Sequence, residues 1–189
     1  VWKQSVQSWH IILFSRVVLM PSAVTKIATG TPSSTNMSTF ATIPGTYDDL
    51  MLIGSSKGDS SSATLNRLYI RINNDGGNNY GHAYWGGESA STWYAAQPTW
   101  DSIYVYGSAD SQSSNTGWGH FYMYFTGYTD SAYKAIQVVG GYSDASNSSG
   151  WTGQAMWLDN SAITELDIGS STGDYISGTT FTLYGISYS

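Results

Sequence analysis

The sequence predicts an all-β protein, an antiparallel β-sandwich or jelly roll, on three observations. Many short segments alternate apolar and polar residues with a period of two, which is the pattern of half-buried strands. Gly, Asn, Asp, Ser and Pro separate these segments at short intervals, as turns do. No helix-period segment of useful length follows Pro21. We therefore expect roughly eight to ten strands in a single domain, since 189 residues suffice for one core.

The expected strands follow one another from residue 23 to the C-terminus. The first half holds predicted strands at Ala23–Ala28, Tyr47–Ile53, Asn66–Asn73, Tyr80–Trp85 and Ser102–Tyr106. The second half holds predicted strands at Gly119–Phe125, Lys134–Val139, Trp151–Leu158, Ala162–Ile168 and Ser177–Ser187. The faces of these strands follow from the alternation, which points their apolar residues inward: Leu68, Ile70, Ile72, Phe121, Met123, Phe125, Ile136 and Val138.

Two connections carry specific expectations. The segment Asn73–Asn79 is rich in Asn, Asp and Gly, which tolerate positive φ, so we expect a hairpin turn there rather than a Ca²⁺ loop. The last strand, Ser177–Ser187, is expected to pair as a hairpin with Ala162–Ile168 across a Gly/Ser loop. In the segment Ala162–Ile168, Glu165 and Asp167 are expected on the solvent face, where they add solubility.

Residues 1–20 differ from the rest, because they are apolar and faintly basic. Ser15 and Arg16 interrupt their apolar run, which is too short for a membrane span, and no small-residue cleavage site marks a signal peptide. Three interpretations stay open: an arm that packs on a neighbouring subunit, an extra core strand, or an extension upstream of a natural start at Met20. We divide the chain into residues 1–22, the arm or extension, and residues 23–189, the sandwich. The candidate arm contacts are Trp9, Ile11, Ile12, Leu13 and Phe14.

Composition excludes several classes of function. Only 11% of residues are charged, the net charge is −6, and no basic stripe is present, so nucleic-acid binding is disfavoured. The chain has no cysteine, which excludes disulfides and thiolate metal sites. Low charge with many Ser, Thr, Tyr and Trp residues is typical of all-β proteins outside cells or on virion and adhesive surfaces.

The residues that carry chemistry form no catalytic pattern. None of His10, His82 and His120 lies in a nucleophile-elbow context, and no Gly-x-Ser-x-Gly occurs. Most of the 13 acids fall in turns, where Asp serves the backbone. We therefore predict a protein without enzymatic activity, catalytic residues, cofactor or metal.

Aromatic residues cluster in the middle of the chain and suggest a binding surface. On a sandwich they can pack in the core, form a subunit interface or stack on glycans, and all three interpretations stay open. The cluster comprises Trp85, Trp93, Trp100, Trp118, Trp151, Trp157, Tyr80, Tyr84 and Tyr94. The candidates for an interface or for glycan stacking are Trp85, Trp93, Trp100 and Trp118.

Three segments together resemble a family of structural proteins of tailed bacteriophages. Phe40–Leu50 is similar to the family's Ile-Pro-x-x-Tyr opening, and Leu68–Tyr80 to its strand followed by Asp-x-Gly-x-Asn-Tyr. The pair Ala162–Ile168 and Ser177–Ser187 resembles the family's ending in Phe-x-Leu-Tyr-Gly-Ile. The resemblance covers residues 23–189, with a longer Trp/Tyr-rich central insert, and with Ile72 at a position where the family tends to have Phe.

The resemblance implies a jelly-roll-like virion protein that decorates or cements the capsid, or that sits on the tail. The expected partners are the major capsid protein and neighbouring copies in a homotrimer, with no nucleic acid and no membrane. A tail or fibre module that binds host glycans, or a carbohydrate-binding module, is the alternative. If residues 1–22 are an arm, their deletion is expected to weaken capsid attachment and leave the sandwich folded.

Overall fold

The computed structural model describes residues 21–59, 65–88, 91–109, 117–143 and 148–188. Within these ranges the chain forms strands and no helix, so the predicted all-β sandwich is confirmed. The candidate arm contacts at residues 9 and 11–14 lie outside the described residues. The strands are β1 (Pro21–Gly30), β2 (Met37–Phe40), β3 (Asp49–Lys57), β4 (Leu65–Ile72), β5 (Tyr80–Glu88), β6 (Ser91–Trp100), β7 (Ile103–Ala109), β8 (Gly119–Phe125), β9 (Lys134–Ser143), β10 (Ser148–Trp157), β11 (Leu166–Ser170) and β12 (Thr180–Tyr188).

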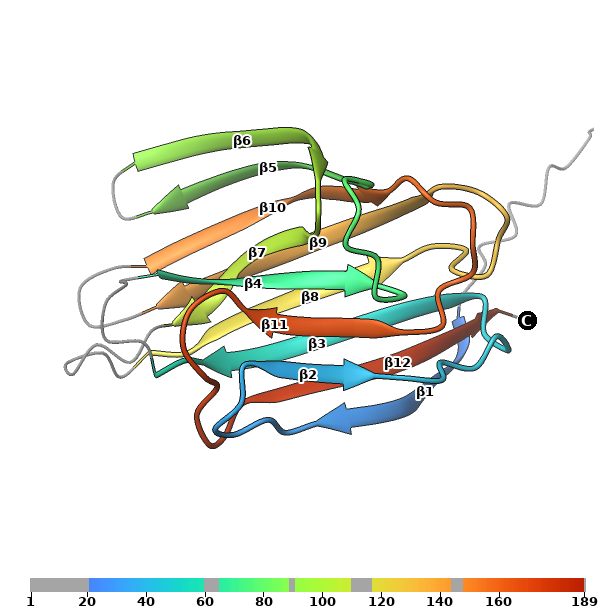
Figure 1. Cartoon of the computed structure of the whole chain (residues 1–189), viewed down its shortest axis with the longest axis horizontal. Coiled ribbons are helices and arrows are strands. Elements are labelled where there is room, and N and C mark those ends of the chain that lie inside the picture. Colours follow the sequence, from blue (N-terminus) through green and yellow to red (C-terminus); the bar gives the residue numbers. More distant parts are fainter. Residues whose placement is uncertain (1–20, 60–64, 89–90, 110–116, 144–147, 189) are drawn as a thin grey trace, which may run out of the picture.

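The strands form two layers (Figure 1). The large sheet has the order β1-β12-β3-β8-β9-β10-β5-β6, and the small sheet has the order β2-β11-β4-β7. Neighbours within each sheet are antiparallel, and a short parallel contact between β3 and β7 joins the two sheets at Ser56 and Lys57. The large sheet therefore presents one wide face to the small sheet and a second wide face away from it.

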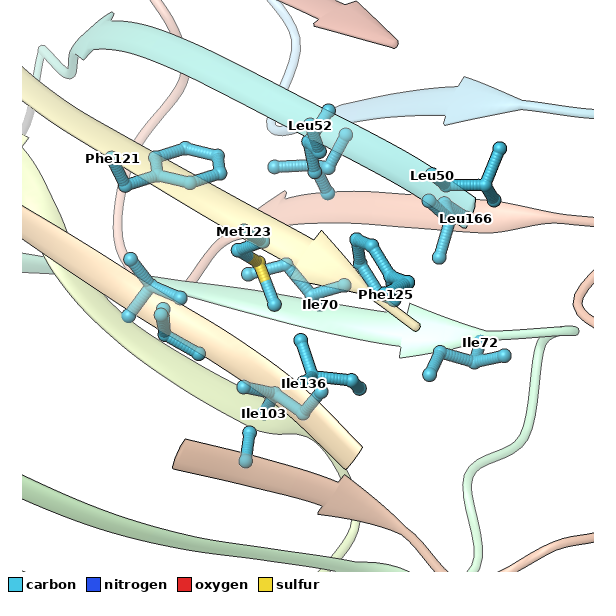
Figure 2. Packing of buried hydrophobic residues seen from close by; sticks show 14 of the residues in the cluster. Leu50, Leu52, Ile70, Ile72, Ile103, Phe121, Met123, Phe125, Ile136 and Leu166 are labelled. Carbon is cyan, nitrogen blue, oxygen red and sulfur yellow. The ribbon is translucent and has the colours of Figure 1, made fainter. Parts of the chain in front are cut away.

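The core fills the space between the two sheets. Figure 2 shows Leu50 and Leu52 of β3 and Phe121 of β8 among side chains from the small sheet, including Ile70 of β4 and Ile103 of β7. Alternation puts every second residue of these strands into this layer, as predicted, and the fully buried aliphatic side chains each contribute about 1.5–3 kcal/mol. The inward residues predicted from sequence are all at most 1% exposed: Leu68, Ile70, Ile72, Phe121, Met123, Phe125, Ile136 and Val138.

The predicted C-terminal hairpin is wrong. β11 pairs with β2 and β4 in the small sheet, whereas β12 pairs with β1 and β3 in the large sheet. The connection between β11 and β12 crosses from one sheet to the other. Tyr175 in this connection is buried and packs against Phe181 of β12, with ring centroids 5.3 Å apart. The backbone of Tyr175 is also bonded to Ser34 and Thr35 in the β1–β2 connection. These contacts fix a crossing where a hairpin turn would have kept both strands in one sheet.

Asp167 corrects a second expectation. It lies on the outer side of β11, opposite Arg71 of β4 and Thr39 of β2, but it is 6% exposed and does not face open solvent. Its carboxylate accepts a hydrogen bond of 2.6 Å from the Thr39 hydroxyl. β11 is covered on both edges by neighbouring strands, and their side chains close over Asp167. Glu165, just before β11, is half-buried.

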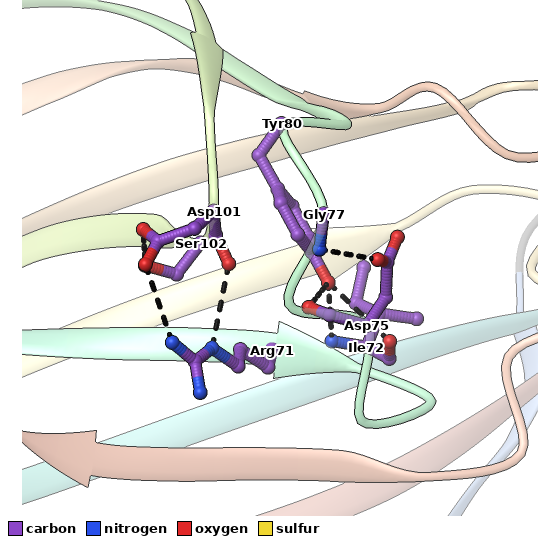
Figure 3. A network of polar contacts seen from close by, with 7 residues as sticks. All are labelled: Arg71, Ile72, Asp75, Gly77, Tyr80, Asp101 and Ser102. Atoms are coloured by element: carbon purple, nitrogen blue, oxygen red, sulfur yellow. Dashed lines mark hydrogen bonds and ion pairs between the residues drawn. The ribbon is translucent and has the colours of Figure 1, made fainter.

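The turn after β4 is tight, but it does not form a hairpin. Asn73 and Asn74 both have φ of 54°, and the Asp75 amide donates to the Ile72 carbonyl at 2.9 Å. The chain then leaves the small sheet, and β5 joins the large sheet beside β10. The Tyr80 hydroxyl bonds back to Ile72 and to the Asp75 carbonyl (Figure 3). The predicted turn chemistry is present, and it builds a crossing between the two sheets.

Two strands were not predicted. β2 has four residues, and β6 is an edge strand of the large sheet that contains Pro98 and lacks alternation. A proline is tolerated on an edge strand because its missing N–H removes no inner ladder bond. A register shift where β6 meets Tyr80 and His82 accommodates this irregular segment.

Candidate binding surface

Side chains on the outer side of the large sheet line up in rows that run across the strands. In each row, one residue of a strand lies directly opposite one residue of the next strand, from β6 at one edge of the sheet to β12 near the other edge. We call the first set the central row; it consists of Tyr94, Trp85, Thr152, Val139, Tyr122, Ile53 and Thr182.

A parallel row lies on each side of the central row. The glycine row consists of Thr92, Gly87, Gly150, Gly141, His120, Ser55 and Thr180. The glutamine row consists of Ala96, Ala83, Gln154, Gln137, Tyr124, Met51 and Tyr184. We call these three rows together the outer face.

The outer face carries no Asp, Glu, Lys or Arg, although the chain has a net charge of −6. Its central row includes large apolar side chains that are open to solvent: Tyr94 is 60% exposed, Trp85 56% and Ile53 42%. Met156, one step beyond the glutamine row on β10, is exposed as well. A contiguous exposed apolar surface of this kind marks a site of interaction, whereas apolar residues scattered singly over a surface do not.

Trp85 and Tyr94 form a prominent pair near the β5–β6 edge. Their ring centroids are 5.5 Å apart and their planes are inclined by 43°. The neighbouring positions in the glycine and glutamine rows on β5 are Gly87 and Ala83, and a Cβ built on Gly150 of β10 would meet nothing within 4 Å. The two rings therefore stand above small neighbours, so a ligand can reach them.

Tyrosines close the outer face at the end that holds the C-terminal strand. The Asp49 carboxylate, 5% exposed, accepts hydrogen bonds of 2.7 Å from the hydroxyls of Tyr124 and Tyr188 and from the Gly127 amide. Burial, together with the hydrogen bonds to Tyr188 and Asp49, raises the pKa of Tyr124. Tyr124 therefore stays a neutral hydroxyl that covers the one buried acid at this margin.

The outer side of the small sheet has a different character. Arg67, Tyr69 and Arg71 of β4 project from it. The Arg71 guanidinium forms an ion pair of 3.3 Å with Asp101 and lies 5.2 Å from the centre of the Tyr69 ring (Figure 3 shows the ion pair). Charged groups thus sit on the small sheet. The three rows of the outer face hold none, although the exposed Lys26 of β1 lies opposite Tyr184 at the end of the glutamine row.

The structure does not gather the four tryptophan candidates into one site. Trp85 lies in the outer face, and Trp100 lies at the end of β6 against Tyr104. Trp118 precedes β8, is 38% exposed, and packs over Gly178, where a Cβ would lie 2.9 Å from its ring. The backbone of Trp93 pairs with Gly86, but its side chain lies outside the described residues. Four other aromatic residues of the cluster are core residues: Tyr80, Tyr84, Trp151 and Trp157.

Sequence reasoning missed most of the outer face. Ile53, Val139 and Met156 lie in predicted strands, but alternation predicts only which residues share a side and not which side is left uncovered. Only the strand registers show that these residues join Trp85 in a continuous surface. A sequence signal does exist: the outward positions of β3, β8, β9 and β10 between Met51 and Met156 contain almost no charge.

No catalytic or metal-binding arrangement stands out among the described residues. That part of the chain holds no group of three or more His, Cys, Asp or Glu side chains that could bind a metal ion. His82 is buried, stacks on Tyr84 at 4.6 Å, and has no hydrogen-bond partner at Nδ1 within the described ranges. Burial lowers the pKa of His82, so the imidazole is neutral at pH 7. Across the same ranges no helix has the length and apolarity that a membrane span requires.

Comparisons with known proteins add little to this picture. No family model matches the chain, and no curated protein matches its sequence. Among solved structures, the chain is similar to the CBM2 module of the evolved Dit of Lactobacillus casei BL23 phage J-1. The identity is 8% and the TM-score 0.25, over 84% of this chain and 76% of that one. A TM-score this low supports no conclusion about function.

Proposed function

We propose that this chain is a virion structural protein of a tailed bacteriophage that decorates the capsid. It binds the major capsid protein through its outer face and acts without catalysis. The observation that carries the proposal is the uncharged set of three rows that crosses the large sheet, with exposed apolar side chains along its central row. The phage assignment rests on the three segments that resemble tailed-phage structural proteins.

The size of the outer face fits a protein partner. Six spacings of about 4.8 Å separate β6 from β12, so the rows are about 29 Å long. Three rows at alternate residues cover a width of about 20 Å, which gives roughly 600 Å². A standard protein interface buries about 800 Å² on each partner, so the outer face supplies most of one.

The chemistry of the outer face also fits a protein partner. Ile53, Val139 and Met156 are aliphatic or thioether side chains, which gain by burial in a dry interface and offer sugars no flat ring. Tyr, Trp and Met are enriched in interface cores, and Asp, Glu and Lys are depleted there. Trp85, near one end of the rows, supplies the large aromatic anchor that interface hot spots use.

A matched pair of charge substitutions tests this proposal. Ile53 in the outer face and Met37 on the small sheet are both exposed strand residues, at 42% and 41%. Each is changed to lysine, and the purified variants are added to capsids that lack the protein, followed by co-sedimentation. We expect Ile53→Lys to weaken capsid binding at least tenfold, because burying an unpaired charge costs several kcal/mol. Met37→Lys is expected to bind as the wild type does.

The proposal fails if the two lysine variants bind capsids equally well, or if the wild-type chain does not bind them. Thermal unfolding of both variants controls for folding, since both positions are exposed. A reconstruction of the virion in which the density of this chain lies on the tail would also contradict the decoration role.

A second function is favoured by one observation, the open Trp85–Tyr94 pair. Exposed aromatic rings above small neighbours can stack on sugar rings, and Gln154 and Thr152 beside them supply hydrogen-bonding groups. On this proposal the chain is a tail or fibre module that binds host glycans. A glycan array probed with the wild type and with Trp85→Ala separates the two functions. Binding that depends on Trp85 supports the glycan module, and an array without hits rejects it.

A further inference from the structure

A chain of aromatic rings on the inner side of β5 joins the large sheet to the small sheet. This ring chain runs from Trp151 of β10 through Tyr84 and His82 of β5 to Trp100 of β6 and Tyr104 of β7. Successive ring centroids are 5.2, 4.6, 5.5 and 4.5 Å apart. His82 is the middle ring, and it is the one member of the ring chain that can gain a positive charge.

His82 is a buried imidazole in which one nitrogen makes no hydrogen bond to the described residues. The side chain is 5% exposed, and Nδ1 is the atom without a partner. The residue opposite it on β10 is Ala155, and the residue opposite on β6 is Gln97, whose side chain lies outside the described residues. A proton on Nδ1 would therefore create a buried N–H donor without a described acceptor.

The charged and titratable groups around the ring chain do not compensate a proton on His82. They are Tyr80 and Tyr84 of β5, Tyr104 of β7, Arg67 and Arg71 of β4, and Asp101 after β6. The Asp101 carboxylate is paired with Arg71 at 3.3 Å. Burial lowers the pKa of His82, and none of these groups contributes to the shift. Stacking on the Tyr84 ring at 4.6 Å thus offsets only part of the cost of burying the charge.

β6 is the element whose movement would admit water to His82. It is an edge strand of the large sheet and pairs with β5 alone among the described strands (Figure 1). The register of this pair shifts between Tyr80 and His82, and Pro98 of β6 has no N–H to donate to β5. An irregular pairing, on one side of β6 only, thus lies directly beside the buried imidazole.

We infer that β6 is an acid-releasable edge strand: protonation of His82 breaks the ring chain at Trp100, and β6 separates from β5 while the rest of the sandwich stays folded. Water then reaches the imidazolium and accepts the hydrogen bonds that the closed fold does not provide. Tyr94 leaves Trp85, its ring partner across the two strands at 5.5 Å, so the outer face loses one end of its central row. This inference does not depend on the capsid proposal.

Native-state amide exchange of the full chain, followed by NMR at about pH 7 and about pH 5.5, tests the inference. At the lower pH an ordinary His is protonated and ordinary carboxyl groups are not. We expect the β6 amides to lose protection by about threefold to tenfold between the two pH values, because the released state takes up a proton with the ordinary His pKa of about 6.5. Their exchange should be insensitive to low concentrations of urea, whereas the β12 amides should exchange through urea-sensitive unfolding of the whole sandwich.

Substitutions of the two described histidines assign the pH effect. His82→Phe keeps a ring in the ring chain and cannot take up a proton, so it should remove the loss of β6 protection at the lower pH. His82→Gln, which has a different shape, is measured beside it so that a misfit of the larger ring does not decide the result. His120→Gln is the matched control, because His120 is exposed on β8 and lies outside the ring chain; this variant should keep the pH effect.

A disulfide across the two strands tests the release itself. Ala83 of β5 and Ala96 of β6 lie directly opposite each other, and the chain has no cysteine of its own. The oxidised Ala83→Cys/Ala96→Cys variant should raise the protection of the β6 amides to that of the β12 amides, and reduction should restore the release. The inference is overturned if the β6 amides respond to urea as the β12 amides do, or if their pH effect persists in both His82 variants.

Discussion

Removing the Asp75 carboxylate is expected to destabilise the crossing that links the two sheets. This carboxylate accepts three hydrogen bonds: from the Gly77 amide at 2.8 Å, from the Asn79 side-chain amide at 2.9 Å, and from the Trp157 indole N–H at 2.8 Å. Trp157 lies at the end of β10 in the large sheet, so Asp75 ties the turn after β4 to the opposite layer. Asp75→Ala removes all three bonds at once.

The size of the effect follows from the burial of the three donors. Trp157 is 2% exposed, so without Asp75 its indole N–H loses its acceptor inside the protein, which costs about 1–3 kcal/mol. Gly77 is exposed, so water replaces its lost bond at little cost. Because hydrogen bonds to a charged acceptor are worth about 1.5–3 kcal/mol, we expect Asp75→Ala to lower the free energy of unfolding by about 3 kcal/mol in total.

Urea unfolding followed by tryptophan fluorescence measures this change, with a double-mutant cycle to isolate the Trp157 bond. Trp157→Phe removes the indole N–H, so the two substitutions together should cost less than the sum of the two alone, by about 1.5–3 kcal/mol. Asp159→Ala is the matched control. Its carboxylate accepts hydrogen bonds from the exposed Ser161, including one of 2.7 Å from the amide, and its loss should cost under about 1 kcal/mol. Additive effects of Asp75→Ala and Trp157→Phe would refute the reasoning.

The Asp75 interactions also set a pH dependence. Burial alone would raise the pKa of Asp75, but the bonds from Trp157, Asn79 and Gly77 outweigh it and hold the pKa below its usual value. The unfolded state therefore binds a proton first as the pH falls below about 4. The stability that Asp75 contributes is complete above the unfolded pKa and is lost as the pH falls through the folded one. In the Asp75→Ala variant, the free energy of unfolding should no longer show this loss as the pH falls.

Two further predictions concern a buried imidazole and a close approach between strands. Burial lowers the pKa of His82, so the unfolded chain takes up a proton first as the pH falls below about 6.5. The free energy of unfolding should therefore drop between pH 7 and 5. Urea unfolding of the His82→Gln variant should show a flatter pH profile in this range. A Cβ at Gly169 would lie 1.9 Å from the Tyr69 ring, so Gly169→Ala should lower the free energy of unfolding by about 1–3 kcal/mol. Adding Tyr69→Ala to the same chain should remove most of the cost of Gly169→Ala. If that cost is undiminished in the double variant, the clash with Tyr69 is not its cause.

Strand existence and strand faces could be predicted where alternation is strong. β8 and the Leu68–Ile72 part of β4 are the clearest cases, because each alternates apolar and polar residues and buries every second side chain. β6 could not be predicted, since an edge strand with Pro98 needs neither alternation nor a complete set of amides. The local pattern therefore identifies strands that bury one face in the core. It misses edge strands, such as β6, that form only because a neighbouring strand pairs with them.

Sheet membership could not be predicted, because an alternating strand suits either layer of a sandwich. Ala162–Ile168 and Ser177–Ser187 have the composition of a hairpin, yet the buried Tyr175 between them carries the chain across the core. The Asn73–Asn74 turn has hairpin chemistry, yet Tyr80 and Asp75 direct it to the other sheet. In both cases a buried tyrosine, Tyr175 or Tyr80, holds a connection that turn residues alone would assign differently.

The candidate site was predictable only as a residue type. An excess of Trp and Tyr indicates a binding surface, but four of the nine named aromatics are core, and Trp85 and Trp100 lie at different places in the fold. The aliphatic members of the outer face, Ile53 and Val139, carry no signal of their own, because they are exposed only where no described strand covers that side of the large sheet. Which side is left uncovered is a property of the whole topology.

The net charge of the chain bears on how the outer face meets a partner. The described acids outside the strands, including Asp59, Asp130 and Asp174, lie in turns and connections, and none of them belongs to the three rows of the outer face, although the chain has a net charge of −6. Copies of the chain therefore repel one another at distances up to the screening length of about 8–10 Å, although their outer faces are neutral. A capsid surface with complementary charge around a matching apolar patch would attract the chain and then bury the outer face.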